Sequence, residues 1–336
     1  MRLFFVARKG EPMIWYIGAF GAALSFALTP VAMSLGCKLH AVDVPKDRRR
    51  MHQRRIPRSG GIALFFAFLI SGLALCQHTS FLFCALGGGG LIFLLGLADD
   101  ILCLGPRCKL FFQGSIGLAT VLGCGVTAPR AVIGWLLWVL TLTNAHNFID
   151  GLDGLLAGTV AVEATAMAAA FWSLGAGNLA LPMLLLATVC LGFRCFNRHP
   201  AVIFAGDCGS GTLGFLLGVF SIPLGTLLPV GIEQLSLFFL FAYPLTDLLA
   251  AVLRRGLRGK SPFAADRGHL HHRIFDVGIP HALCVRLLHW ICMGTAGIGV
   301  LLCRGDRWPF AGMLCFGVAI LLIYLRYFIV GFVENG

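Results

Sequence analysis

Long runs of apolar residues, separated by short polar segments, make up almost the whole chain. Each run approaches the roughly 20 residues that a helix needs to cross the hydrocarbon of a bilayer. The runs fill the 336 residues and leave no room for a second, soluble domain. The pattern predicts a single all-α domain over 1–336, a polytopic membrane bundle of about eleven transmembrane helices near 14–36, 61–77, 81–98, 110–128, 131–147, 155–174, 177–193, 211–230, 233–252, 285–303 and 309–331.

The composition agrees with a membrane protein. Hydrophobic residues make up 58% of the chain and charged residues only 12%, against roughly 25% charged in a soluble domain. The first run, from Met13 to Gly36, is longer than the apolar part of a typical cleaved signal peptide, so we expect a retained helix. The 13 cysteines form no Cys-x-x-Cys pair and lie mostly inside apolar runs, which indicates buried hydrophobic side chains and no disulfide framework.

The basic residues are concentrated in segments that fall on one side of the membrane if every run crosses it. Eight Lys and Arg lie between residues 38 and 58, and six lie between residues 254 and 273. The positive-inside rule therefore predicts an N-terminus outside and a C-terminus in the cytoplasm, although three basic residues precede the first run. No soluble basic domain exists to bind nucleic acid, so we expect no nucleic-acid partner.

This orientation places every chemically suggestive polar segment on the cytoplasmic face, in predicted loops at 38–60, 99–109, 144–154, 194–211 and 254–284. Acidic residues beside hydrocarbon are costly, so their presence at the ends of apolar runs indicates a functional site. An ion-coupled transporter is one alternative. Transporter sites, however, tend to lie near the membrane midplane and between structural repeats, and this chain shows no internal repeat.

Four polar residues recur at every third position after the fifth run: Asn144, Asn147, Asp150 and Asp153. An α-helix has 3.6 residues per turn, so four such steps sweep half its circumference and cannot share one face. Gly151 and Gly154 predict a break in the helix, which would let both carboxylates converge on one ligand. A calcium loop is excluded because Ala161 stands where a bidentate Glu is needed. A simple capped turn is the alternative.

Two other acidic segments fit a phosphate and metal site. In Asp99-Asp100, adjacent carboxylates disfavour each other's ionised form unless a cation or hydrogen bonds intervene. The turn Gly206-Asp207-Cys-Gly-Ser-Gly211 precedes an apolar helix, whose free amides can hold phosphate oxygens while Asp207 holds Mg²⁺. The alternatives are a helix end that faces water for the first segment and a capped tight turn for the second.

Two basic segments fit the recognition of anions. The segment 266–273 packs three His and two Arg into eight residues, which favours phosphate binding, because no fourth zinc ligand with the usual spacing accompanies them. The first loop, with Arg54 and Arg58 among Pro and Gly residues, could bind anionic lipid or nucleotide phosphates. Each segment could instead be a solvated basic loop or a topology signal.

Taken together, these motifs resemble the polyprenyl-phosphate N-acetylhexosamine-1-phosphate transferase superfamily, glycosyltransferase family 4, in the branch that starts O-antigen, enterobacterial common antigen and wall teichoic acid synthesis. The matching segments run in family order along nearly the whole chain: Asp43-x-Pro45, Arg49, His52, Pro57-x-x-Gly60-Gly61, Asp99-Asp100, Asn144-x-x-Asn147-x-x-Asp150-Gly-x-Asp153-Gly, Gly206-Asp207-x-Gly-Ser, Pro244-x-x-Asp247, Pro262-Phe and Asp266-Arg-x-His269-Leu-His271-His272.

The resemblance implies a role for each site residue. Asp207 resembles the Mg²⁺-binding aspartate of the family. Asp99 resembles the carboxylate that activates the lipid phosphate, with Asp100 beside it, and the implied metal ligands are Asp207 and Asp100. Catalytic roles are implied for Asp99, Asp100, His269, His271 and His272. Substrate binding is implied for Asn144, Asn147, Asp150, Asp153, Phe204, Arg54, Arg58 and Arg267, with Phe204 stacking on uracil.

The activity implied by the resemblance is the transfer of N-acetylglucosamine 1-phosphate from a UDP-sugar to undecaprenyl phosphate, with release of UMP. Mg²⁺ is the expected cofactor, with Mn²⁺ as a substitute, and the expected location is the inner (plasma) membrane. The phospho-MurNAc-pentapeptide branch is an alternative, but it typically carries three consecutive histidines, whereas this chain has His-Leu-His-His. Other N-acetylhexosamines remain open, and a homodimer is a further expectation.

Overall fold

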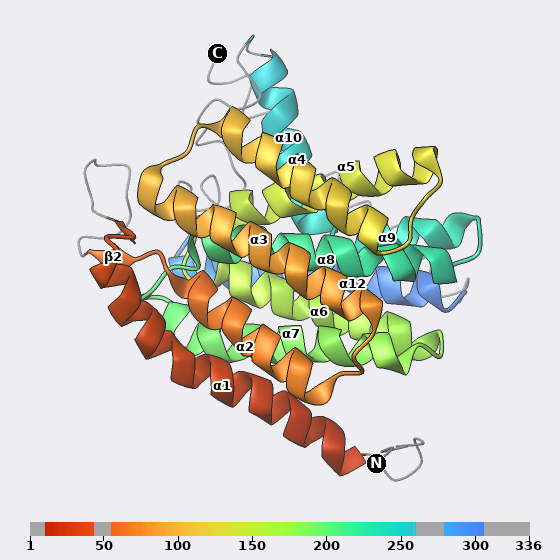
Figure 1. Cartoon of the computed structure of the whole chain (residues 1–336), viewed down its shortest axis with the longest axis horizontal. Helices are drawn as coiled ribbons and strands as arrows, with labels where there is room; N and C mark the ends of the chain where they lie inside the picture. The colour runs from red at the N-terminus through yellow and green to blue at the C-terminus, as the bar shows by residue number, and fades with distance from the viewer. Residues whose placement is uncertain (1–10, 44–54, 258, 260–278, 306–336) are drawn as a thin grey trace.

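The computed structural model describes residues 11–43, 55–257, 259 and 279–305 (Figure 1). Nearly all of them lie in helices that run side by side, with one short hairpin between the first two. The helices that precede the loop 198–205 are α1 Glu11–Lys38, α2 Gly60–Leu75, α3 Ser80–Leu102, α4 Pro106–Gly123, α5 Pro129–Ile149, α6 Leu155–Ser173 and α7 Gly177–Asn197. The remaining helices are α8 Gly206–Leu227, η1 Ile232–Leu235, α9 Ser236–Leu240, α10 Ala242–Leu257 and α12 His281–Cys303.

The helices have the length and composition of a multi-pass membrane protein. Among the described residues, seven helices are long and apolar enough to cross a membrane, or up to eight if one bent pair counts as a span. Helix α2 is apolar but has only 16 residues, and α4 carries Arg107 and Lys109 in its first turn. The predicted count of eleven spans therefore stays a prediction, and the run near 309–331 lies outside the described residues.

One predicted span has a different shape. We expected a continuous helix over 233–252, but the chain forms η1 and α9 and then turns by 79° into α10. Pro244 explains the break, because its ring would clash with the carbonyl of Leu240 if α9 continued. Beyond the break, α10 buries Asp247 with much of one face and exposes apolar residues such as Leu257 on the other. It is therefore an amphipathic helix, not the second half of a straight span.

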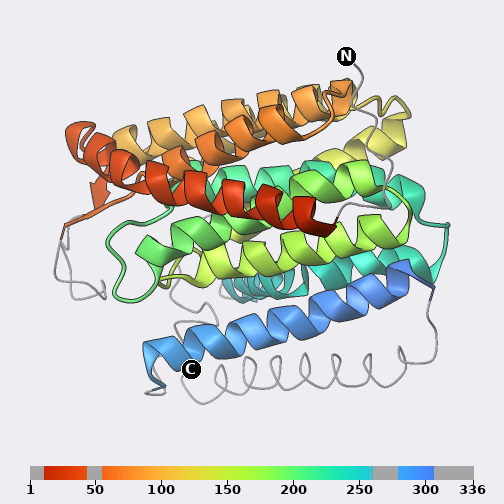
Figure 2. The same ribbon diagram turned by 90° about the horizontal axis from the view of Figure 1, so that it is seen from below.

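Helix α8 forms the centre of the bundle. Figure 2 shows α2 to α4 along one margin and α12 along the other, with α8 between them. Most of α8 is buried from Cys208 to Ile222. Its glycines allow close packing: a Cβ on Gly214 would lie 2.5 Å from the Leu142 carbonyl oxygen, and one on Gly218 would lie 3.0 Å from the Val139 Cα. Small residues allow such close helix packing where lipid removes the hydrophobic drive for association.

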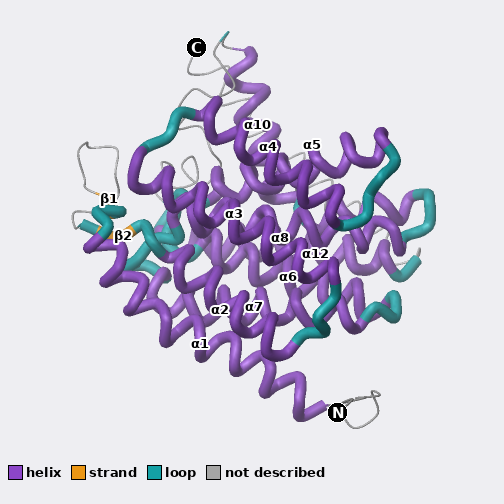
Figure 3. The backbone as a smooth tube through the Cα atoms, in the orientation of Figure 1, coloured by secondary structure: helices purple, strands orange, loops and turns teal. Residues whose placement is uncertain are grey.

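The connections between helices gather at the two ends of the bundle (Figure 3). One end holds the hairpin of β1 (Val42–Asp43) and β2 (Ile56–Pro57), the turn 150–154 and the loop 198–205. The other end holds the short connections 76–79, 124–128 and 174–176. The prediction that the polar segments share one end is thus confirmed for the described residues. Which side of the membrane this end faces stays a prediction.

Candidate active site

The start of α8 and the end of α3 meet at a capped helix terminus. Asp100, in the last turn of α3, accepts hydrogen bonds from the amides of Asp207 (3.0 Å) and Cys208 (2.9 Å). Its side chain is fully buried. A carboxylate at this position satisfies free amides and complements the positive end of the helix dipole. Gly96 lets the two helices approach, because a Cβ there would lie 2.5 Å from the Asp207 carbonyl oxygen.

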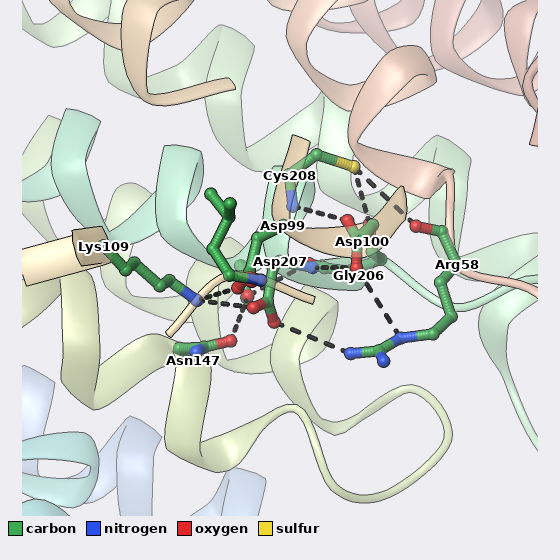
Figure 4. A network of polar contacts seen from close by, with 11 residues as sticks. Arg58, Asp99, Asp100, Lys109, Asn147, Gly206, Asp207 and Cys208 are labelled. Carbon is green, nitrogen blue, oxygen red and sulfur yellow. Dashed lines mark hydrogen bonds and ion pairs between the residues drawn. The ribbon is translucent and has the colours of Figure 1, made fainter. Parts of the chain in front are cut away.

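Lys109 bridges two carboxylates in front of this terminus (Figure 4). Its Nζ lies 2.9 Å from Asp99 Oδ2 and 2.5 Å from Asp207 Oδ2. Asp99 uses its other oxygen, Oδ1, to accept a hydrogen bond from the Leu104 amide (2.7 Å) as the chain leaves α3. The first turn of α4 thereby brings the ammonium group to the ends of α3 and α8.

Arg58 closes the other side of the cluster. The hairpin carries it there, because the Phe204 amide donates to the Pro57 carbonyl (2.8 Å) and the Gly60 amide to the Phe204 carbonyl (2.9 Å). The Arg58 guanidinium lies 3.6 Å from Asp100 Oδ1 and 3.6 Å from Asp207 Oδ1. These contacts are ion pairs that are too long for good hydrogen bonds.

Burial and neighbouring charges together set the pKa values of Arg58 and Asp150, which lie beside the membrane-spanning segments. Burial opposes the charge of Arg58, but Asp100, Asp207 and Asp150 outweigh it and raise the Arg58 pKa. Burial is also the largest influence on Asp150: it raises the pKa of this carboxyl to about 7, while Arg58 and the Gly206 amide act in the opposite direction. Asp150 therefore sits in an environment where a proton or a cation is needed to offset its charge.

The predicted break after the fifth apolar run is present. Helix α5 ends at Ile149, Gly154 adopts a φ of +75°, and α6 begins at Leu155. Asn147 faces α8 and accepts a hydrogen bond from Ser210 Oγ (2.7 Å). Asn144 instead faces α4, where its Nδ2 donates to Gln113 Oε1 (3.1 Å).

The two aspartates of this turn have different partners. Asp150 interacts with Arg58 and the α8 terminus, whereas Asp153 accepts from the Ala201 amide (3.1 Å) and pairs with His199 Nδ1 (2.8 Å). The contacts of the described residues give the two carboxylates no common partner. Their predicted convergence on one ligand therefore stays a prediction.

Several predicted residues lie outside the described part of the chain, namely Arg54, Arg267, His269, His271 and His272. Phe204 is described and half-buried beside the start of α8. Lys109 was missed as a site residue, because basic loops are common topology signals. Its position one helical turn after Pro106, close behind Asp99-Asp100, was the available clue.

Asn197 was also missed. Its Oδ1 accepts from the Gly154 amide (3.1 Å) and its Nδ2 donates to the Ile203 carbonyl (2.9 Å), so it ties the α5–α6 turn to the α7–α8 loop.

The donor set fits a divalent cation such as Mg²⁺, which prefers oxygen ligands. Four carboxyl groups (Asp99, Asp100, Asp150 and Asp207) face two cations (Arg58 and Lys109), so the ionised carboxylates outnumber the basic groups among the described residues when all four are charged. Asp207 keeps 18% of its side chain exposed and so is accessible to an ion. Each Asp100 oxygen already accepts one backbone amide, so only its second lone pair is left for a metal.

The fold and the site define a multi-pass membrane protein with an acidic, cation-bridged centre at one end of a helical bundle. Residues 82–225 match the profile of glycosyl transferase family 4. The chain is 30% identical to a probable undecaprenyl-phosphate N-acetylglucosaminyl 1-phosphate transferase of Bacillus subtilis (strain 168), over 94% of this chain and 92% of that protein.

Two further relatives each share 31% identity with the chain. One is the undecaprenyl-phosphate alpha-N-acetylglucosaminyl 1-phosphate transferase of Yersinia pestis, with 93% of this chain and 88% of that protein covered. The other is a decaprenyl-phosphate N-acetylglucosaminephosphotransferase of Mycobacterium tuberculosis, with 92% and 89% covered. The chain belongs to glycosyl transferase family 4, among the polyprenyl-phosphate hexosamine-1-phosphate transferases, and the resemblance seen in its motifs is confirmed.

Proposed function

We propose that this protein transfers N-acetylglucosamine 1-phosphate from UDP-N-acetylglucosamine to a polyprenyl phosphate, most simply undecaprenyl phosphate, and releases UMP. The observation that carries the proposal is the similarity over more than nine tenths of the chain to transferases named for this reaction. The acidic centre adds chemical support, since uncompensated carboxylates beside two basic groups suit a metal-bound diphosphate.

In the proposed reaction, an oxygen of the lipid phosphate attacks the phosphorus that carries the sugar. The bond from that phosphorus to the bridging oxygen breaks, and UMP leaves with the electron pair. One diphosphate bond is broken and one is made, so the reaction is expected to be near balance. Asp99, next to Lys109, is the group we assign to activate the lipid phosphate.

Asp207 is the residue we assign to Mg²⁺. Asp100 fixes the helix terminus from which Asp207 projects, and its own role as a metal ligand stays a prediction. The bound ion would neutralise the diphosphate. Arg58 and Lys109 are already paired with Asp207, so an incoming phosphate would offer both of them a new anionic partner. The histidines and Arg267 of the 254–284 segment keep their predicted roles beside the phosphates.

For the donor, we assign Asn147, Asp150 and Asp153 to the uridine and diphosphate, with Phe204 stacking on uracil. The backbone of Phe204 is held on one side by Pro57 of β2 and on the other by Gly60 at the start of α2, which supports a fixed position for the ring. Apolar side chains exposed on α4, such as Phe111 and Phe112, offer a surface for the prenyl chain. Such anchoring would orient the acceptor phosphate toward the centre.

We further propose that the site end faces the cytoplasm from the inner (plasma) membrane. The basic residues of the first loop and of 254–273 support this orientation. Cysteine introduced at Arg55, an exposed position of the same loop, tests it: modification only from outside intact cells would overturn it.

The activity is tested with purified protein, undecaprenyl phosphate, Mg²⁺ and UDP-N-acetylglucosamine, with UMP release as the readout. UDP-N-acetylgalactosamine and UDP-MurNAc-pentapeptide serve as competing donors. The proposal expects UMP and a lipid-linked diphosphate sugar from the first donor. UMP release only with the pentapeptide donor would assign the chain to the phospho-MurNAc-pentapeptide branch instead. No UMP with any donor, together with ion flux in liposomes, would overturn the transferase.

A further inference from the structure

A second polar cluster lies at the same end of the bundle and contains different chemistry. It joins Asp153 from the α5–α6 turn, His199 from the α7–α8 loop and His281, the first residue of α12. One potential ligand atom from each of the three side chains lies within 4.8 Å of the others. Three separate segments of the chain thus bring two imidazoles and one carboxylate together.

The contacts within the cluster leave binding capacity unused. His199 Nδ1 pairs with Asp153 Oδ2 at 2.8 Å, and the His199 and His281 rings stack with centroids 4.2 Å apart. His281 Nδ1 is buried and has no hydrogen-bond partner among the described residues. A buried polar atom without a partner is unfavourable, so the site gains if this nitrogen binds something.

The donor set selects a class of ion. Two imidazoles and a carboxylate are typical of Zn²⁺ and its neighbours, whereas Mg²⁺ takes mainly oxygen ligands. Tetrahedral Zn²⁺ with bonds of about 2.0–2.2 Å needs ligand atoms about 3.4 Å apart, so the side chains must move by about 1 Å and the rings must leave their stack. His199 is 51% exposed, which gives an ion access and leaves room for a water as fourth ligand.

We propose that Asp153, His199 and His281 form a binding site for Zn²⁺ or a similar transition-metal ion, separate from the acidic centre around Asp207. We also propose that the bound ion weakens donor binding, because it takes the carboxylate of Asp153. This second part rests on the proposed function, in which Asp153 contacts the nucleotide sugar. The first part stands on the cluster alone.

Direct binding tests the site. Protein purified without a polyhistidine tag is freed of metal by a chelator, and Zn²⁺ is titrated calorimetrically in excess Mg²⁺; Co²⁺ absorption reports imidazole ligation. We expect one ion per chain. His281→Gln should weaken its binding at least about tenfold, since even groups that only orient a metal ligand are worth about 10–100-fold. His78→Gln, at the opposite end of the bundle, is the matched control and should bind like the unaltered protein.

Two further variants exclude other locations. Asp207→Asn should leave Zn²⁺ affinity unchanged, because Asp207 belongs to the acidic centre. Replacement of His269, His271 and His272 by Gln tests the histidine-rich segment outside the described residues. If this replacement abolishes Zn²⁺ binding while His281→Gln does not, the proposed site is overturned. Unchanged affinity in both His281→Gln and His199→Gln overturns it as well.

Kinetics test the second part. Zn²⁺ should raise the KM for UDP-N-acetylglucosamine with little change in kcat, and His281→Gln should shift this inhibition to higher Zn²⁺ concentrations. Zn²⁺ that binds at the triad but lowers only kcat would overturn the competition with donor. A chain that binds Zn²⁺ yet transfers no sugar would overturn the proposed function and leave the metal site intact.

Discussion

The acidic centre and an ionic pair inside the bundle differ in their charge balance. In the acidic centre, Lys109 and Arg58 face more carboxylates than they can neutralise, and Asp207 stays partly exposed. In the interior, His146 Nε2 lies 2.7 Å from Glu163 Oε2, and both side chains are fully buried. The charges of this pair can balance each other, although Glu163 Oε1 has no hydrogen-bond partner among the described residues. The comparison separates a cluster suited to receive a ligand from one that holds helices together.

The protonation of the interior pair follows from its contacts. His146 Nδ1 lies 2.8 Å from the Leu142 carbonyl, which can only accept, so Nδ1 carries a hydrogen. A single further proton is then shared between Nε2 and the carboxyl group of Glu163, and the pair is neutral overall. Among the described residues, the carboxylates of the acidic centre outnumber its basic groups, which is why we assign the cation to it.

The largest expected effect comes from Asp207→Asn. Losing this carboxylate should lower UMP release at least about 10³-fold, because a bound metal supplies several kcal/mol of transition-state stabilisation. The fold should survive, since Asp100 still caps the same amides. Activity is measured across a wide range of Mg²⁺ concentrations. Full activity at any of these Mg²⁺ concentrations would show that Asp207 does not bind the metal. The acidic centre and the interior pair would then no longer differ in their need for a cation.

The interior pair should respond in stability and not in chemistry. Glu163→Leu leaves His146 buried beside an apolar group and should lower the free energy of unfolding by about 3 kcal/mol. This is the lower end of the range for a broken buried pair, because the remaining imidazole can be neutral. Adding His146→Phe should restore most of that loss. Thermal unfolding of the four proteins in this double-mutant cycle measures the coupling. Single variants that are as stable as the parent would show that the pair contributes nothing.

Lys109→Met tests the bridge between Asp99 and Asp207. We expect about a 10²-fold loss of activity, of the size seen when one preorganised electrostatic group is removed, and partial recovery at high Mg²⁺ because the freed carboxylates attract the ion. Arg107→Gln, two residues earlier and exposed, is the matched control. Equal losses in both variants would mean that general positive charge matters, and not the bridge.

The last effect is a pH-dependent one at Asp150. Its pKa is raised to about 7 in the folded protein, against about 3.9 when unfolded. The folded state therefore holds the proton longer, and stability falls as pH rises between these values, by at most about 1.4 kcal/mol per pH unit. Asp150→Asn lacks this titration. In metal-free buffer, its stability relative to the parent should therefore rise as the pH increases across the same window. A stability difference that does not change with pH would contradict the burial of the charge.

The sequence predicted the parts of this structure that depend on local chemistry. Glycines at 151 and 154 mark the helix break, and the alternation of apolar runs with basic loops places the polar segments at one end. It did not predict the bend before α10 or the role of Lys109. Pro244 was a local signal for the bend, whereas the role of Lys109 depends on which helices become neighbours. The same holds for the pairing of Asp153 with His199, whose partners lie 46 residues apart in the chain.

The cap of α8 by Asp100 has a consequence for biogenesis. The carboxylate and the amide that satisfies it are separated by 107 residues, so several helices must be synthesised and inserted between them. Until α8 arrives, the nascent chain holds an acidic pair at the membrane boundary without its amide partners. The centre therefore assembles late in translation. A ribosome-bound chain that stops before Gly206 should already span the membrane, but it lacks the helix that carries Asp207.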